Sequence, residues 1–197
     1  KYRVIDTAGM RKKGKIYESV EKYSILRALS AVEKSDVVLV VVDGERGIIE
    51  QDKHVAGNAH EAGKGVILVV NKWDLVEKND KTIYRFTEKI RQTLSFIPYA
   101  EIIFISALTG QRIGKLYETI DIVAENHALR VATGVLNEIM TEAVAMQQPP
   151  SDKGRRLKIY YATQPSTKPP TFVFFCNNAQ LFHFSYGRQV VHLNQYP

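Results

Sequence analysis

Four short apolar runs follow one another along the first two thirds of the chain. Each is rich in β-branched residues, as strands are, and their apolar character is continuous rather than alternating, which indicates burial on both faces. The runs are YRVID (2–6), DVVLVVVD (36–43), VILVVNK (66–72) and EIIFIS (101–106). Segments with a helical period lie at 20–33, 51–61, 82–96 and 115–125. This order predicts an α/β fold with a doubly wound parallel sheet.

The strand and helix alternation stops near residue 128, which predicts one domain over 1–128 and a second over 129–197. The second part has a helical period over 131–146, then a loop of Pro, Gly and Lys at 149–154. Two strands are expected at 157–163 and 171–176, and a short helix near 180–186. The proline-rich segment 165–170 is expected to be irregular. Together these elements predict a small α+β unit.

Polar residues come directly after three of the four predicted strands, where ligands bind in doubly wound sheets. The sets are Asp6, Thr7, Ala8 and Gly9; Asn71, Lys72 and Asp74; and Ser106, Ala107 and Leu108. In that order they resemble the DxxG, NKxD and SAx motifs of translation-factor-like GTPases. Three motifs in the right order, each at a strand end, make a chance match improbable.

The chemistry of a guanine nucleotide accounts for these residue types. The carboxylate of Asp74 can accept both hydrogens of the N1–H and N2 edge, which adenine does not offer. Lys72 can lay its alkyl stem over the base, Asn71 can tie loops together, and the Ala107 N–H can donate to guanine O6. Asp6 would hold Mg²⁺ through water, and the Gly9 N–H would reach the γ-phosphate of GTP.

Two parts of a GTPase site are not found in the sequence. It contains no GxxxxGK[ST] phosphate loop, so either it is a fragment or a further segment completes the domain. Met10 stands where many GTPases have the Gln that orients the attacking water. Hydrolysis would then need another group, a partner, or an ion such as K⁺ to handle the transition-state charge.

Composition adds a polyanionic partner and a compartment to these expectations. The net charge of +6 favours nucleic acid, because Lys and Arg release counterions from phosphates. Cys176 is the only cysteine, and the five His show no metal-ligand spacing, so we expect no zinc. No apolar stretch is long enough for a membrane span, and the chain opens without a signal-peptide pattern. A cytoplasmic protein is expected, and its oligomeric state is left open.

Longer stretches of the sequence, beyond these short motifs, resemble one family in particular. Residues 6–75 are similar to the second GTPase domain of the bacterial tandem GTPase family EngA/Der, and residues 157–186 to its C-terminal KH-like domain. The resemblance implies a P-loop GTPase-type sheet, GTP hydrolysis with Mg²⁺, and a role with rRNA in assembly of the large ribosomal subunit. The tail after Tyr186 departs from the family, so the resemblance does not extend to its last strand.

Basic residues of the second part are candidate RNA contacts. They are Lys153, Arg155, Arg156, Lys158 and Lys168, interleaved with Tyr160 and Tyr161. No GxxG loop, with which other KH domains clamp a nucleic-acid backbone, occurs in 157–186. The alternative is a solvated strand face with aromatic core partners. A second basic run at 11–15 either touches rRNA or is an exposed loop.

Two functions from different classes remain. The first is a GTPase of ribosome assembly, and the second is a non-catalytic RNA- or ribosome-binding module whose nucleotide site is vestigial. A nucleotide titration separates them, because the GTPase should bind GDP and not ADP, whereas the binding module should ignore both.

Overall fold

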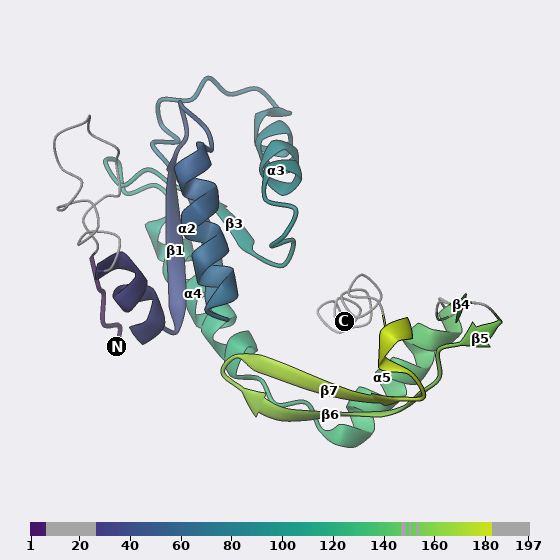
Figure 1. Cartoon of the computed structure of the whole chain (residues 1–197). Coiled ribbons are helices and arrows are strands. Elements are labelled where there is room, and N and C mark those ends of the chain that lie inside the picture. Colours follow the sequence, from purple (N-terminus) through teal and green to yellow (C-terminus); the bar gives the residue numbers. More distant parts are fainter. Residues whose placement is uncertain (7–26, 147–148, 150, 153, 183–197) are drawn as a thin grey trace, which may run out of the picture. The chain divides into compact units, whose positions relative to one another are not determined.

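The structure is a computed structural model that describes residues 1–6, 27–146, 149, 151–152 and 154–182 of the chain. The chain divides into two compact units, Lys1–His127 and Ala128–Pro197. Figure 1 shows the elements of each unit. No helix in the described ranges is long and apolar enough to cross a membrane.

A parallel sheet of three strands forms the centre of the first unit. The strands are β1 (Val37–Asp43), β2 (Gly65–Asn71) and β3 (Glu101–Phe104), in the order β1-β2-β3. The central strand β2 is buried from Gly65 to Val70. Its uninterrupted apolar sequence is explained by this burial on both faces. The α/β class and the parallel sheet predicted from the sequence are confirmed.

Helices cover both faces of this sheet (Figure 1). On one face α2 (Glu50–Glu61) and α3 (Thr82–Thr93) enclose a core centred on Trp73, which is 1% exposed. On the other face α4 (Ile113–Ala128) packs against Ile67 and Val69 of β2. Residues 27–34 are also helical. These two layers hold the strand ends, and the loops that follow them, in fixed places.

The predicted strand at 2–6 is wrong, because residues 1–6 lie outside any strand and are exposed. Instead Tyr2 packs its ring 5.2 Å from Tyr117 and donates its hydroxyl to Asp121 on α4 at 2.8 Å. A strand exists only where a neighbour supplies hydrogen bonds, and within the described residues β1 pairs with β2 alone. The β-branched sequence of 2–6 is therefore not sufficient to make it a strand.

The second unit is built on one helix and one hairpin. The helix is α5 (Thr133–Met146), and the hairpin joins β6 (Ile159–Thr167) to β7 (Pro170–Cys176). Leu136 and Met140 of α5 pack against Ala162 of β6. Short strands β4 (Ser151–Asp152) and β5 (Arg155–Arg156) pair with each other, and η1 (Ala179–Leu181) is a 3-10 turn.

The expectation that 165–170 is irregular is confirmed only in part, since β6 continues through Pro165 to Thr167. The pairing with β7 shifts register between Thr163 and Ser166. Proline cannot donate a ladder hydrogen bond, and a local irregularity of this kind is where a strand tolerates it.

Candidate nucleotide site at the carboxyl edge of the sheet

The ends of β1 and β2 meet at one edge of the sheet. Asp43, the last residue of β1, pairs in register with Asn71, the last residue of β2. Immediately beyond it, the Gly44 N–H donates to the Asn71 carbonyl oxygen at 2.8 Å. A Cβ at Gly44 would lie 2.9 Å from that oxygen, so a glycine allows this close approach. The loop after β1 therefore lies directly against the start of the Asn71–Asp74 motif.

Asn71 connects the loops that follow β2 and β3. Its Oδ1 accepts a hydrogen bond from the Ala107 N–H at 2.9 Å, and the Trp73 N–H donates to Ile105 at 3.0 Å. Asn71 thus lies where a residue that ties the loops together would lie. The Ala107 N–H was expected to donate to guanine O6. Because it already donates to Asn71, a bound guanine would have to accept from the same N–H or displace Asn71 from it.

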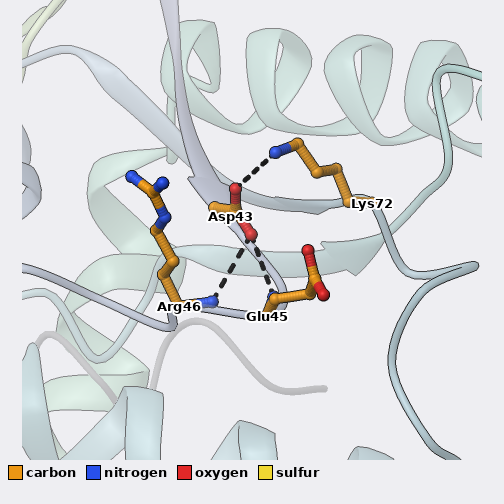
Figure 2. A network of polar contacts seen from close by, with 4 residues as sticks. All are labelled: Asp43, Glu45, Arg46 and Lys72. Atoms are coloured by element: carbon orange, nitrogen blue, oxygen red, sulfur yellow. Dashed lines mark hydrogen bonds and ion pairs between the residues drawn. The ribbon is translucent and has the colours of Figure 1, made fainter.

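Lys72 is held by Asp43 rather than extending freely. Figure 2 shows the Lys72 Nζ on the Asp43 carboxylate, with an Nζ to Oδ2 distance of 2.6 Å. Asp43 Oδ1 accepts from the backbone N–H groups of Glu45 at 3.0 Å and Arg46 at 3.4 Å. The backbone of Lys72 is left-handed, with φ of 60°. The hydrogen bond from Lys72, followed by those from the Glu45 and Arg46 amides, holds the pKa of Asp43 below its ordinary value against the opposing effect of burial.

Asp74 has one carboxylate oxygen without a partner. Its Oδ1 is buried, and no hydrogen-bond partner for it lies among the described residues. A buried acceptor left unpaired is costly, and such atoms are rare in folded proteins. A ligand that donates hydrogens at this point would satisfy it. This is the donor pattern that the N1–H and N2 edge of guanine presents.

The loop after β3 presents its backbone through a tight turn. Ser106 is fully buried; its N–H donates to the Gln111 carbonyl at 3.2 Å, and its Oγ accepts from the Thr109 N–H at 3.1 Å. Leu108 is 88% exposed. Ser106 is therefore a structural anchor in this geometry, while Ala107 and Leu108 face outward from the turn.

The remaining motif is only partly described. Asp6 is exposed, while Thr7, Ala8, Gly9 and Met10 lie outside the described residues. The basic run at 11–15 also lies outside them. Among the residues that are described, no three of His, Cys, Asp or Glu come together as a metal site. The structure brings Asn71, Lys72, Asp74 and Ala107 together and leaves Asp6 unassigned.

Asp43 is the site residue that the sequence reasoning missed. It is a polar residue at the end of an apolar strand, which is the signal used for the other motifs. The ion pair to Lys72 gives it a place in the site that sequence alone does not indicate.

The basic candidates in the second unit do not all lie at one place. Arg156 and Lys158 line one open groove of about 470 Å³ together with Tyr160. Arg155 is exposed on β5, and Lys168 is exposed in the turn between β6 and β7, at the opposite end of β6 from Ile159. Lys153 lies outside the described residues.

A parallel α/β sheet with guanine-type motif residues at its carboxyl edge, followed by a small α+β unit, defines a protein of the P-loop GTPase class. Two family models match the chain. Residues 21–126 match the elongation factor Tu GTP binding domain, and residues 130–193 match the KH-domain-like C-terminal domain of EngA bacterial GTPase enzymes.

Curated relatives give the same result at high identity. The chain is 66% identical over 187 residues to the GTPase Der of Agathobacter rectalis and 64% identical over 188 residues to that of Geobacillus thermodenitrificans. The chain therefore belongs to the EngA/Der family of bacterial GTPases, as predicted from residues 6–75 and 157–186. The matches cover 95% of this chain but only 42% and 43% of the two relatives.

Solved structures are similar in fold. A structure of Era in complex with MgGDPNP and a fragment of 16S ribosomal RNA has a TM-score of 0.53 at 20% identity. That match covers 96% of this chain and 68% of Era. A variant of Aquifex aeolicus Era bound to GDP.AlF4⁻ has a TM-score of 0.52, also at 20% identity, over 94% of this chain and 68% of the other. At this identity the likeness concerns the fold alone.

Proposed function

We propose that the first unit recognises the guanine base for a GTPase that acts in assembly of the large ribosomal subunit, and that the second unit contacts rRNA. Membership of the EngA/Der family supports the GTPase class. The observation that carries the nucleotide proposal is the buried, unpartnered Oδ1 of Asp74. This chain spans less than half the length of its relatives, so GTP hydrolysis is proposed for the whole protein and not for this chain alone.

The base-recognition proposal rests on three side chains with separate tasks. Asp74 accepts hydrogens from the N1–H and N2 edge, which sets guanine apart from adenine. Asn71 holds the Ala107 turn against the motif through its 2.9 Å hydrogen bond, so the loop that faces the base is preorganised. Lys72 covers the base with its alkyl stem while its ammonium is held by Asp43. Ser106 and Leu108 complete the loop around the base.

The phosphate end of the site is proposed from residue chemistry. Asp6 is an exposed carboxylate, and Mg²⁺ is commonly held by one or two carboxylates, water and substrate phosphates, so this residue fits the role. Thr7, Ala8 and Gly9 belong to the same proposed segment. When bound, Mg²⁺ would neutralise phosphate charge. Met10 cannot orient the attacking water. K⁺ is a candidate for handling the transition-state charge, which a comparison of hydrolysis in K⁺ and Na⁺ would test.

The RNA part of the proposal rests on the second unit. Its match to a KH-like family and its exposed Arg155, Arg156 and Lys158 support contact with a phosphate backbone. Lys168 and Lys153 remain candidates for the same role. The Era complex with ribosomal RNA shows that one protein of similar fold binds rRNA. A cytoplasmic location goes with this proposal, because GTP and assembling ribosomes are found there.

Changing Asp74→Asn tests the base assignment. The chain should bind GDP more tightly than ADP in a calorimetric titration. In Asp74→Asn the preference should move from guanine toward xanthine nucleotides, because an amide offers a donor where xanthine carries an oxygen. Asp80→Asn is the matched control, since it removes the same charge from an exposed turn outside the motif. Equal affinity of the unaltered chain for GDP and ADP would contradict the proposal.

A second candidate, a non-catalytic RNA-binding module with a vestigial nucleotide site, is favoured by the basic groove of the second unit. The same titration decides between them. A module of this kind would bind RNA with steep salt dependence and bind neither nucleotide.

A further inference from the structure

An open groove in the second unit combines apolar walls with two basic side chains. It has a volume of about 470 Å³, which lies within the range of sites for small ligands. Val144 and Ala145 at the end of α5 form one side, and Leu157 and Ile159 add further apolar surface. The polar contribution comes from three residues, Arg156, Lys158 and Tyr160.

Tyr160 is turned toward this groove by an irregularity in the hairpin. The pairing of β6 with β7 shifts register between Ile159 and Tyr161, so Tyr160 is the extra residue in the strand. Both Tyr160 and Tyr161 are consequently exposed, at 65% and 44%, although neighbours in a regular strand face opposite sides. Bulges of this kind redirect a side chain and often lie beside functional sites.

Tyr161 lies in different surroundings. Its ring stacks on Phe175 of β7, with centroids 4.2 Å apart and planes 7° from parallel. Tyr161 does not belong to the lining of the groove. The two adjacent tyrosines therefore differ in one respect that matters, because Tyr160 borders the groove and Tyr161 already has an aromatic partner.

Asn177 holds the basic segment in place. Its side chain accepts from the Lys158 N–H at 2.9 Å and donates to the Arg156 carbonyl at 3.0 Å. Its own N–H donates to the Lys158 carbonyl at 3.0 Å. Three hydrogen bonds from one residue at the end of β7 fix the backbone from which Arg156 and Lys158 project. A fixed backbone lowers the entropy lost when these side chains bind a ligand.

From this geometry we propose that the groove binds an unstacked base of single-stranded RNA, with Tyr160 stacking on the base and Lys158 and Arg156 contacting the adjoining phosphates. This inference rests on the RNA part of the proposed function and specifies its site. Aromatic stacking with nearby Lys and Arg is how single-stranded RNA is recognised, whereas duplex RNA keeps its bases stacked and out of reach of a groove. An acidic peptide would use the two charges but has no need of an exposed aromatic ring beside an apolar groove.

Paired tyrosine variants test the site in the full chain. Binding of a short fluorescent single-stranded RNA is measured by anisotropy, without nucleotide present. Tyr160→Ala should weaken binding about 5- to 150-fold, because base stacking contributes about 1–3 kcal/mol by alanine substitution. Tyr160→Phe should retain binding, since it keeps the ring. Tyr161→Ala is the matched control and should leave RNA affinity unchanged.

Salt titration separates stacking from phosphate contact. Lys158→Gln should reduce the slope of log K against log salt by about 1, while Tyr160→Ala should leave the slope unchanged. Duplex RNA of the same sequence and a poly-glutamate peptide of equal charge should compete poorly. Circular dichroism of each variant confirms that it is folded.

Four results would overturn the inference. Equal losses in Tyr160→Ala and Tyr161→Ala would move the contact to the face that carries Phe175. Unchanged binding in a folded Tyr160→Ala would remove the groove from RNA recognition while leaving the RNA part of the proposed function intact. Displacement of RNA by poly-glutamate at equal charge would point to an acidic protein partner. Absence of any RNA binding by the unaltered chain would remove both the groove inference and the RNA part of the proposed function, whatever the chain's preference for GDP over ADP.

Discussion

Asp43 determines where the ammonium group of Lys72 lies. The carboxylate is fixed by two backbone N–H groups, those of Glu45 and Arg46, before it meets Lys72 at 2.6 Å. Because Lys72 starts from a left-handed backbone, its stem leaves the strand end in a direction that other conformations would not give. We therefore expect the pair to position Lys72 beside the base rather than to act as an ordinary surface ion pair.

Replacing Asp43→Asn should affect the nucleotide site more than the fold. Lys72 is about half exposed, and exposed ion pairs contribute at most about 1 kcal/mol, so the loss of unfolding free energy at neutral pH should lie below that. GDP affinity should fall as Lys72 loses its fixed position. Denaturation followed by the fluorescence of Trp73 gives the stability, and calorimetry gives the affinity.

The pH dependence of this variant has a definite sign. The pKa of Asp43 in the folded state lies below its ordinary value of 3.8. Its contribution to stability is therefore complete above pH 3.8 and is lost as pH falls through the lower folded-state value. The stability difference between the unaltered chain and Asp43→Asn should shrink in that acidic window. Glu45→Gln, which leaves the pair in place, is the control, and a difference that grows on acidification would contradict the assignment.

Residue types at strand ends were predictable, and their partners were not. The rule that ligands bind after the carboxyl ends of parallel strands places Asn71, Lys72 and Asp74 at one edge from sequence alone. The ion pair of Lys72 and the engagement of the Ala107 N–H depend on loop geometry across 29 and 36 residues of chain. Separations of that size leave no local pattern in the sequence.

At the scale of elements, side-chain amides attach α5 and the segment before it to β6. Asn137 of α5 donates to the Ala162 carbonyl at 2.9 Å and accepts from the Ala162 N–H at 2.8 Å. Gln164, 3% exposed, accepts from Val131 at 2.7 Å and donates to Leu129 at 3.0 Å. Ala162 is fully buried, so its backbone groups depend on Asn137 for hydrogen bonds on this side.

Asn137→Ala should destabilise the second unit. It removes both partners of Ala162, and a buried polar group left unpaired costs about 1–3 kcal/mol. The loss should appear as a lower thermal midpoint in far-UV circular dichroism and as faster hydrogen exchange at the Ala162 amide. Glu138→Ala, the exposed neighbour on the same helix, should leave both unchanged. An unaltered exchange rate at Ala162 would contradict this account of the contact.

Elements were predictable where burial alone decides them. The run over 66–70 is buried throughout, and its apolar sequence suffices to predict β2. Residues 2–6 also contain β-branched residues but have no strand neighbour in the described chain, so pairing, a tertiary property, decided against a strand. Pro165 indicated a break, yet the hairpin absorbed it with a register shift.

At the scale of the whole molecule, each hydrophobic cluster of the described residues lies within one of the two units. The clusters around Trp73 and around Ile67 contain residues of the first unit only. The clusters around Leu157 and around Leu136 contain residues of the second unit only. Trp73 is the single tryptophan of the sequence, so its fluorescence reports the first unit and is silent about the second. Circular dichroism, in contrast, reports helices and strands of both.

Denaturation should therefore proceed in two transitions that different probes separate. In urea, the Trp73 fluorescence transition should not coincide with the full change in circular dichroism, because coincident probes are expected only of a single cooperative unit. Asn137→Ala should shift the part of the circular dichroism transition that lacks a fluorescence counterpart and leave the fluorescence midpoint in place. Asp43→Asn should do the reverse. A single transition in both probes, shifted equally by both variants, would mean that the two units unfold as one and that stability changes in the second unit are transmitted to the first.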